Sequence, residues 1–242
     1  MKRFFIGLSS FALLSVFQVT ALGQSPSRED LLRQLETKRA ELQKLEEQFL
    51  APSDEDRTAF AEFLKQPNTG IIRLLPREVY DLFPNKPSKL TIRGGGAYYS
   101  FARLTHEYGY GSDIELASGY LSVGFAGANY GLMIDLGDVS LDEITSDYPG
   151  ARSLADYAAA KDEPQARVEQ RQVQVGRILD GATYKERLPV KTGTTFLLRS
   201  INYDSTDVLV AFRVVRKDTD GSVIIAWRLL KQYPTPKLAR NS

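Results

Sequence analysis

The spacing of apolar residues changes along the chain. Between residues 28 and 50 they recur every three to four positions, which is the period of an amphipathic helix. From residue 71 onward they alternate with polar residues or form short runs, as in half-buried and fully buried strands. This order of patterns predicts a helix followed by a β-rich domain.

The predicted helix over 28–50 follows Ser27, a residue type that caps helix N-termini, and ends before Pro52. Such a helix predicts self-association through its apolar stripe. The alternative is an amphipathic helix that packs on the following domain or forms an N-terminal arm. Written as heptads, the a and d positions of the stripe hold Leu31, Leu35, Lys38, Leu42, Leu45 and Phe49.

The residues after Pro52 predict a second, short helix over 53–65. Ser53 and Asp56 have the spacing of a capping box, in which two side chains satisfy backbone N–H groups at the start of a helix. The sequence Pro-Asn-Thr-Gly at 67–70 then breaks the chain before the first strand.

The first half of the β-rich part is unusual in composition, because residues 94–137 hold 10 of the 18 glycines and 6 of the 12 tyrosines. The run from Gly94 to Gly96 lacks the Lys-Ser/Thr of a phosphate loop, so we expect it to permit a sharp bend or close backbone packing. Gly127 to Asn129 predicts a tight hairpin link. The strands predicted in this half are 71–75, 89–93, 97–104, 120–125 and 130–136.

Residues 138–170 lose the alternation. Short helices are predicted at 141–145 and 153–161. The polar stretch 165–174 predicts an exposed helix, or an edge that leads into a strand near 173–179.

The last third of the chain predicts three successive strands, 194–202, 207–217 and 222–231, with Asp220-Gly221 in the second turn. Both faces of the last two strands are mostly apolar, so we expect a sheet covered on both sides or a barrel wall. Phe212 and Trp227 are candidate core residues. The predicted fold class is α+β, mainly antiparallel β (a sandwich or a distorted barrel) preceded by an N-terminal amphipathic helix. The predicted domains are the helix at 24–52 and a single β-rich globular domain at 53–242.

Residues 1–23 have the layout of a secretory signal peptide. Lys2 and Arg3 precede an apolar stretch, and Ala21 and Gly23 place small residues at the −3 and −1 positions of a cleavage site. The apolar run is short for a membrane span, and a polar chain follows it directly. We therefore expect cleavage after Gly23, no transmembrane span afterwards, and a periplasmic or secreted protein.

The composition excludes several classes of function. The formal net charge is +1, so the chain has no electrostatic attraction to nucleic acid. With no cysteine and one histidine, it has neither a disulfide framework nor a His- or Cys-based metal motif, and its stability must come from an apolar core. It carries no cofactor-binding signature, so no cofactor is expected.

His106 is the first candidate for catalysis. Glu107 and Asp113 are nearby carboxylates, which suit acid–base chemistry. A zinc-protease motif would need a second histidine at the position of Tyr110, so that site is excluded. The alternative function is therefore a secreted hydrolase with a His/carboxylate site around His106. The competing interpretation is a structural histidine that ties a turn together.

A cluster of tyrosines is the stronger candidate, for binding. A tyrosine ring has an apolar face and a polar tip, which suits sugar faces and protein interfaces. Strand propensity alone also explains tyrosine at such positions. The leading hypothesis is an exported, non-catalytic binding or assembly module of the bacterial envelope whose partner is a glycan or an envelope protein. The predicted binding residues are Tyr98, Tyr99, Tyr108, Tyr110, Tyr120 and Tyr130.

Overall fold

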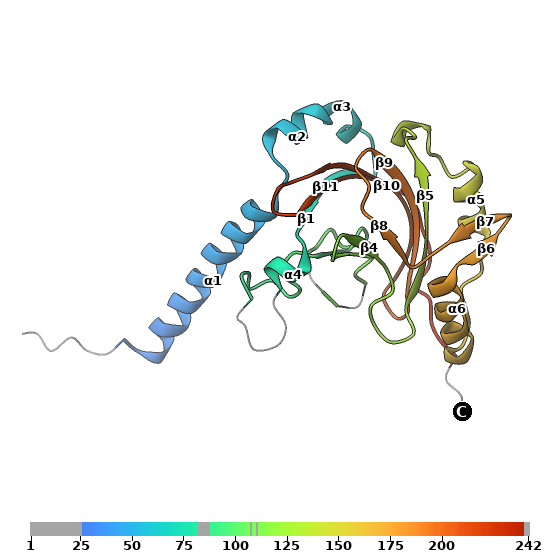
Figure 1. Cartoon of the computed structure of the whole chain (residues 1–242). Helices are drawn as coiled ribbons and strands as arrows, with labels where there is room; N and C mark the ends of the chain where they lie inside the picture. Colours follow the sequence, from blue (N-terminus) through green and yellow to red (C-terminus); the bar gives the residue numbers. More distant parts are fainter. Residues whose placement is uncertain (1–25, 82–87, 107, 110, 240–242) are drawn as a thin grey trace, which may run out of the picture. The chain divides into compact units, whose positions relative to one another are not determined.

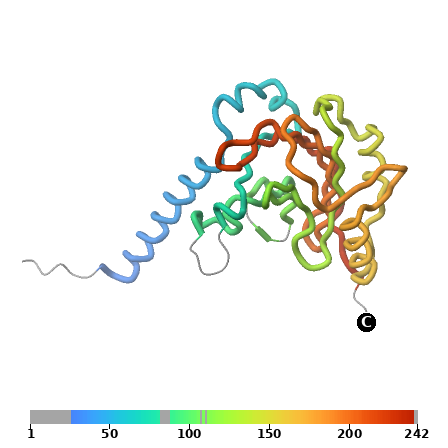
Figure 2. Tube along the Cα trace, in the orientation of Figure 1, coloured from blue at the N-terminus to red at the C-terminus, as the bar shows by residue number. Residues whose placement is uncertain are grey.

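An open five-stranded antiparallel sheet forms the centre of the fold, with the strand order β1-β11-β10-β9-β5 (Figure 1). β1 comes early in the chain and β11 comes near the C-terminus, yet the two strands pair and run side by side (Figure 2). The computed structural model describes residues 26–81, 88–106, 108–109 and 111–239, and the predicted signal peptide lies outside them. The five strands are β1 (Thr69–Leu74), β5 (Tyr130–Gly137), β9 (Thr194–Asn202), β10 (Thr206–Lys217) and β11 (Val223–Gln232).

The three C-terminal strands confirm the sequence prediction closely. β10 lies between β9 and β11 and pairs with both. Its residues alternate between two separate apolar clusters, with Val210 and Phe212 in one and Leu209 and Ala211 in the other. The central sheet is therefore covered on both faces, as apolar residues on both sides of a strand require.

A second antiparallel sheet, with the order β2-β3-β4-β8, covers one face of the central sheet. The cluster between the two sheets includes Tyr99, Phe101 and Ile114 from the second sheet region and Phe196 and Phe212 from the first. The two layers make a sandwich-like α+β fold rather than a closed barrel. The strands of the second sheet are β2 (Tyr98–Tyr99), β3 (Ile114–Ala117), β4 (Tyr120–Ser122) and β8 (Arg187–Pro189).

Helices and a short hairpin cover the opposite face of the central sheet (Figure 1). The sequence predicts either an exposed helix or an edge strand for residues 165–174. In the structure these residues lie in a helix. Asp162 caps its N-terminus through a hydrogen bond from the backbone N–H of Gln165, and Gly176 ends it with φ +119°. The elements of this layer are η1 (Leu141–Glu143), α5 (Pro149–Asp156), α6 (Glu163–Val175), β6 (Arg177–Leu179) and β7 (Ala182–Tyr184).

The N-terminal helices begin where their caps predict. The backbone N–H of Asp30 donates to the Ser27 hydroxyl at the start of α1, and Ser53 and Asp56 form a complete capping box on α2. Among the described residues, no helix is both long and apolar enough to cross a bilayer. The chain divides into two units, residues 1–42 and 43–242. The N-terminal helices are α1 (Arg28–Leu50), α2 (Asp54–Ala59), α3 (Ala61–Leu64) and α4 (Arg77–Tyr80).

The glycine-rich half departs most from the predicted strands. Residues 89–93 form bends and a turn instead of a strand, and the predicted strand 97–104 shortens to the two residues of β2. The chain turns after β2, because the backbone N–H of Ser100 donates to the carbonyl of Thr105, and Leu104 has φ +56°. β3 was not among the predicted strands.

The link at residues 127–129 is not the tight hairpin that the sequence predicts. β4 belongs to the second sheet and β5 to the central sheet, so the intervening residues carry the chain from one layer to the other. Gly127 has φ +55°, a conformation that glycine adopts at no steric cost and that a hairpin and a crossing between layers can both use.

Candidate functional site

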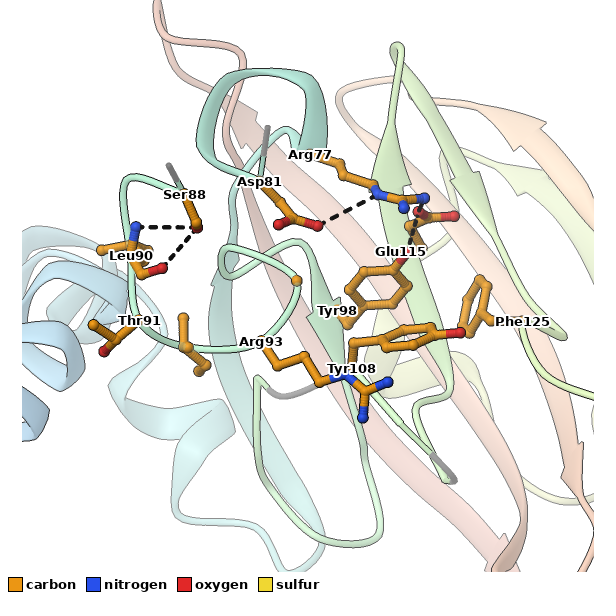
Figure 3. Close-up of a pocket in the computed structure, with 12 residues that line it drawn as sticks. Arg77, Asp81, Ser88, Leu90, Thr91, Arg93, Tyr98, Tyr108, Glu115 and Phe125 are labelled. Atoms are coloured by element: carbon orange, nitrogen blue, oxygen red, sulfur yellow. Dashed lines mark hydrogen bonds and ion pairs between the residues drawn. The ribbon is translucent and has the colours of Figure 1, made fainter. Parts of the chain in front are cut away.

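A cavity of about 500 Å³ lies beside α4, β2 and β3, and a bent segment, residues 88–94, forms one wall (Figure 3). It is the candidate site because aromatic and charged side chains converge on it, as in most ligand pockets. The residues that line it are Arg77, Asp81, Ser88, Leu90, Thr91, Ile92, Arg93, Gly94, Tyr98, Tyr108, Glu115 and Phe125.

The glycine run positions the wall of this cavity. Gly94 has φ +86°, and a Cβ atom at this position would lie 2.4 Å from the Tyr98 ring. Gly95 and Gly96 also have positive φ, and a Cβ on Gly96 would lie 2.5 Å from Leu50. The run therefore permits both a sharp bend and close backbone packing, as the sequence predicts, and brings Arg93 to the cavity.

Arg77, Glu115 and Tyr98 form a polar network along one side of the cavity. Arg77 donates from Nη1 to Glu115 Oε1 at 2.9 Å, and the Tyr98 hydroxyl donates to the same oxygen at 2.6 Å (Figure 3). Arg77 Nε also lies 3.7 Å from an Asp81 carboxylate oxygen. Burial and the Glu115 carboxylate raise the pKa of Tyr98, so its hydroxyl stays protonated and donates. Both acids of the cavity are thus engaged with groups of the protein itself.

Aromatic rings form the rest of the wall. The Tyr98 ring lies 4.8 Å from that of Tyr108 and 5.2 Å from that of Phe125, the latter edge-to-face. The guanidinium carbon of Arg93 lies 4.7 Å from the Tyr108 ring centroid, and the backbone N–H of Tyr108 donates to the Arg93 carbonyl. Main-chain and side-chain contacts together hold Arg93 against Tyr108 at the edge of the cavity.

Of the six tyrosines predicted to bind, Tyr98 and Tyr108 line the cavity. Tyr120 is 41% exposed and stacks against Arg187 outside it. Tyr110 lies outside the described residues.

The other two tyrosines are buried in different layers. Tyr99 packs between the two sheets, with its ring 4.9 Å from that of His106. Tyr130 lies on the opposite face of the central sheet, where its hydroxyl accepts a hydrogen bond from the backbone N–H of Ala160. The five described tyrosines therefore do not form one surface, because alternation and the crossing between layers send them to separate places.

Two of the three candidate catalytic residues, His106 and Asp113, lie in the described part of the chain, and they bond to different partners. His106 Nε2 lies 2.9 Å from the carbonyl oxygen of Arg73, so this nitrogen carries the proton and donates. Within the described part of the chain, no serine or carboxylate hydrogen-bonds to His106, and Glu107 lies outside that part. These contacts fit a structural histidine that ties the turn after β2 to β1.

Asp113 is fully buried elsewhere in the second sheet region. It accepts hydrogen bonds from the backbone N–H of Phe101 and from the side-chain amide of Asn202. Burial raises its pKa to about 6, while hydrogen bonds from the Ser200 hydroxyl and from the backbone of Phe101 oppose that change. Its environment joins β2, β3 and β9 and opens to none of the three described cavities.

We expect His106 to make the protein less stable as the pH falls. Burial lowers its folded-state pKa to about 4, from an ordinary value of 6.5, so the unfolded chain takes up the proton first. Its contribution to stability is complete above pH 6.5 and is lost as the pH falls toward 4. Between pH 7 and 5, wild type should lose about 2 kcal/mol more unfolding free energy than His106→Gln, measured by urea denaturation at each pH.

Asp113 changes in the opposite sense, because its raised pKa adds stability as the pH falls from about 6 toward 4. The comparison of wild type with His106→Gln cancels this contribution, since both proteins keep Asp113. Equal pH dependence of the two proteins would contradict the neutral state that we assign to His106 in the folded protein.

The sequence did not single out Arg77, Arg93 or Phe125. Arg93 directly precedes the glycine run, and Phe125 follows Gly124, whose backbone has φ +78°. A charged or aromatic residue next to a glycine was therefore the signal that the sequence offered for Arg93 and Phe125. The convergence of these residues depends on the pairing of β2 with β3, which the sequence does not reveal.

Two other cavities lie elsewhere in the described part of the chain. One of about 720 Å³ lies between α2, α3 and η1, and one of about 470 Å³ is lined mainly by Ala158 to Ala160 and the start of α6. Within the described ranges, no group of three or more His, Cys, Asp or Glu residues could hold a metal ion.

Comparison with known proteins adds no assignment for this site. No protein-family model, curated protein or solved structure matches the chain significantly.

Proposed function

We propose that this protein is an exported, non-catalytic binding module of the bacterial envelope, and that the cavity beside β2 and β3 is its binding site. One observation carries the proposal: the rings of Tyr98, Tyr108 and Phe125 and the side chain of Arg93 converge on one cavity of about 500 Å³. The signal-peptide pattern of residues 1–23 supports export, and the absence of cysteine is compatible with it.

The chemistry of the cavity supports binding rather than catalysis. Its two acids, Asp81 and Glu115, both face Arg77, and Glu115 also accepts from Tyr98. A catalytic nucleophile is activated by a base, and the two side chains must lie within hydrogen-bond distance of each other. The two aliphatic hydroxyls of the cavity wall are otherwise engaged: Ser88 donates to the carbonyl of Leu90, and Thr91 donates to Glu46.

Replacing Tyr108 with alanine should weaken ligand capture at least about tenfold, because a half-exposed ring at a binding site commonly provides a large share of the affinity. The probes are insoluble peptidoglycan and a panel of immobilised glycans, with the bound fraction measured over a range of protein concentrations. Arg187→Gln is the control, since it removes an arginine stacked on a tyrosine outside the cavity. Capture that is equal for wild type and Tyr108→Ala, or absent for wild type, would contradict the proposal.

The predicted apolar stripe of α1 supports a second element of the proposal, self-association with another copy of the chain. Leu31 is 46% exposed, Leu35 52% and Leu42 41%, although heptad a and d positions are usually buried. The opposite face carries charged residues, as in a coiled coil.

Leu35→Asp combined with Leu42→Asp should abolish any dimer, because two carboxylates at a positions cannot be buried without a partner. Sedimentation velocity over a range of concentrations measures the change. A wild type that stays monomeric at every concentration would exclude this role for the helix.

A further inference from the structure

We propose that the cavity beside β2 and β3 binds an acidic saccharide, a chain of sugar rings that carry carboxylates. Arg93 would pair with a carboxylate, and Tyr108 and Phe125 would pack against a sugar ring. This inference rests on the proposed function and names the chemical class of its ligand.

The distribution of charge around the cavity calls for an anionic ligand. Arg77 is paired with Glu115 at 2.9 Å and approaches Asp81 at 3.7 Å. Arg93 differs from Arg77, because no described carboxylate pairs with it and its guanidinium group lies against the Tyr108 ring instead. A guanidinium group held by an aromatic ring keeps its N–H groups available for a carboxylate, which it can bind through two parallel hydrogen bonds.

Most other stacked arginines in the described part of the chain have an acid partner, and Arg187, which stacks on Tyr120 without one, lies outside the cavity. Arg73, over the Phe49 ring, pairs with Asp218 and Asp220, and Arg199, over the Tyr233 ring, pairs with Asp207. Arg93 combines a stacked guanidinium group, no described acid and a position on a cavity wall. With no acid partner in the described part of the chain, its charge can pair with a ligand.

The aromatic wall suits a sugar ring. Tyr98 is 2% exposed and backs the other two rings, while Phe125 and Tyr108 are half-buried and keep part of their rings accessible. The electron-rich face of such a ring attracts the C–H bonds on the flat face of a sugar. A cavity of about 500 Å³ lies within the range of small-ligand pockets, which suits a short segment of a saccharide chain.

A peptide ligand fits this site less well, because the strand edge beside the cavity, β2, is only two residues long. At its two ends the backbone is already paired, since the N–H of Leu75 donates to Gly96 and that of Ser100 donates to Thr105. Peptides that add a strand to a sheet need such groups unpaired. Among the described lining residues, Leu90 and Ile92 alone offer aliphatic surface, which is too little for the continuous apolar groove that a helical peptide needs.

The test compares two probes that share a ring shape and differ in charge, tetragalacturonate and neutral galacto-oligosaccharides of similar length. Binding to the full chain is measured by isothermal titration calorimetry. Wild type should bind tetragalacturonate at least about tenfold more tightly than the neutral probe, and added NaCl should weaken only the acidic probe. Arg93→Gln should reduce tetragalacturonate affinity about tenfold and leave the neutral probe unchanged.

Arg187→Gln is the matched control, because it also removes a charge that is stacked on a tyrosine, but outside the cavity. It should bind both probes as wild type does, and thermal melting checks that each variant is folded. Equal affinity of wild type for the two probes would overturn the inference while leaving a binding cavity in place. Loss of binding in Arg187→Gln as large as in Arg93→Gln would also overturn it.

Two further outcomes separate the inference from the proposed function. Binding of neither probe, together with peptidoglycan capture that depends on Tyr108, would overturn the acidic-saccharide ligand and keep the binding module. Displacement of tetragalacturonate by a Glu-rich peptide at lower concentration than by unlabelled saccharide would assign the site to acidic peptides instead.

Discussion

Replacing Phe212 with alanine is expected to lower the free energy of unfolding by about 3–5 kcal/mol, a large part of the 5–15 kcal/mol typical of a domain. Phe212 is fully buried in β10, between the two sheets. Its ring stacks on Phe196 at 5.1 Å and faces Phe101 at 6.4 Å, so truncation leaves a cavity in a rigid aromatic cluster. Urea denaturation followed by tryptophan fluorescence measures the change.

Val175→Ala serves as the control, because Val175 is 82% exposed and its truncation should change the unfolding free energy by less than about 0.5 kcal/mol. A loss below about 1 kcal/mol for Phe212→Ala would mean that the space between the sheets is not closely packed, contrary to the sandwich described above.

Replacing Asp207 with asparagine is expected to cost about 3–5 kcal/mol, because it leaves the charge of Arg199 buried without a counter-charge. Both side chains are 4% exposed, and two hydrogen bonds of 3.0 and 2.9 Å join them. Arg199 also donates to the carbonyl of Leu154 and stacks on Tyr233 at 3.8 Å. The pair therefore links β9 and β10 to α5 and the C-terminal segment.

The double variant Arg199→Met with Asp207→Leu separates the burial of a charge from the loss of packing. It should be more stable than Asp207→Asn, since it removes both charges and keeps apolar volume. Thermal melting of Arg199→Met, Asp207→Leu and the double variant completes the cycle. A double variant that loses the sum of the two single losses would show that the two residues act independently.

The C-terminal strands could be predicted because their signal is local. Alternation in β10 and β11 assigned Val210 and Leu209 to opposite faces, and the structure places them in separate clusters. The capping signals of Ser27 and Ser53 were equally local. β3 and the short β2 were harder to predict. Their extent depends on which strands pair and on the positive φ angles at Gly94 to Gly96, and the spacing of apolar residues does not encode either.

The candidate site was predicted only in part for the same reason. Tyr98 and Tyr108 were predicted from composition, but composition does not tell an exposed ring from a buried one, as Tyr99 and Tyr130 show. Arg93 becomes a candidate only when the structure shows its contact with Tyr108 and its lack of a described acid partner.

Mapping a bound saccharide by nuclear magnetic resonance tests most directly whether the cavity is the binding site. Uniformly ¹⁵N-labelled protein is titrated with tetragalacturonate, and the backbone amide signals are followed. We predict saturable shifts that concentrate at Arg93, Gly94, Tyr98, Tyr108 and Phe125, the residues that meet at the aromatic wall. Saturable shifts confined to α6, to the hairpin of β6 and β7 or to α1, with these five amides unchanged, would contradict the account.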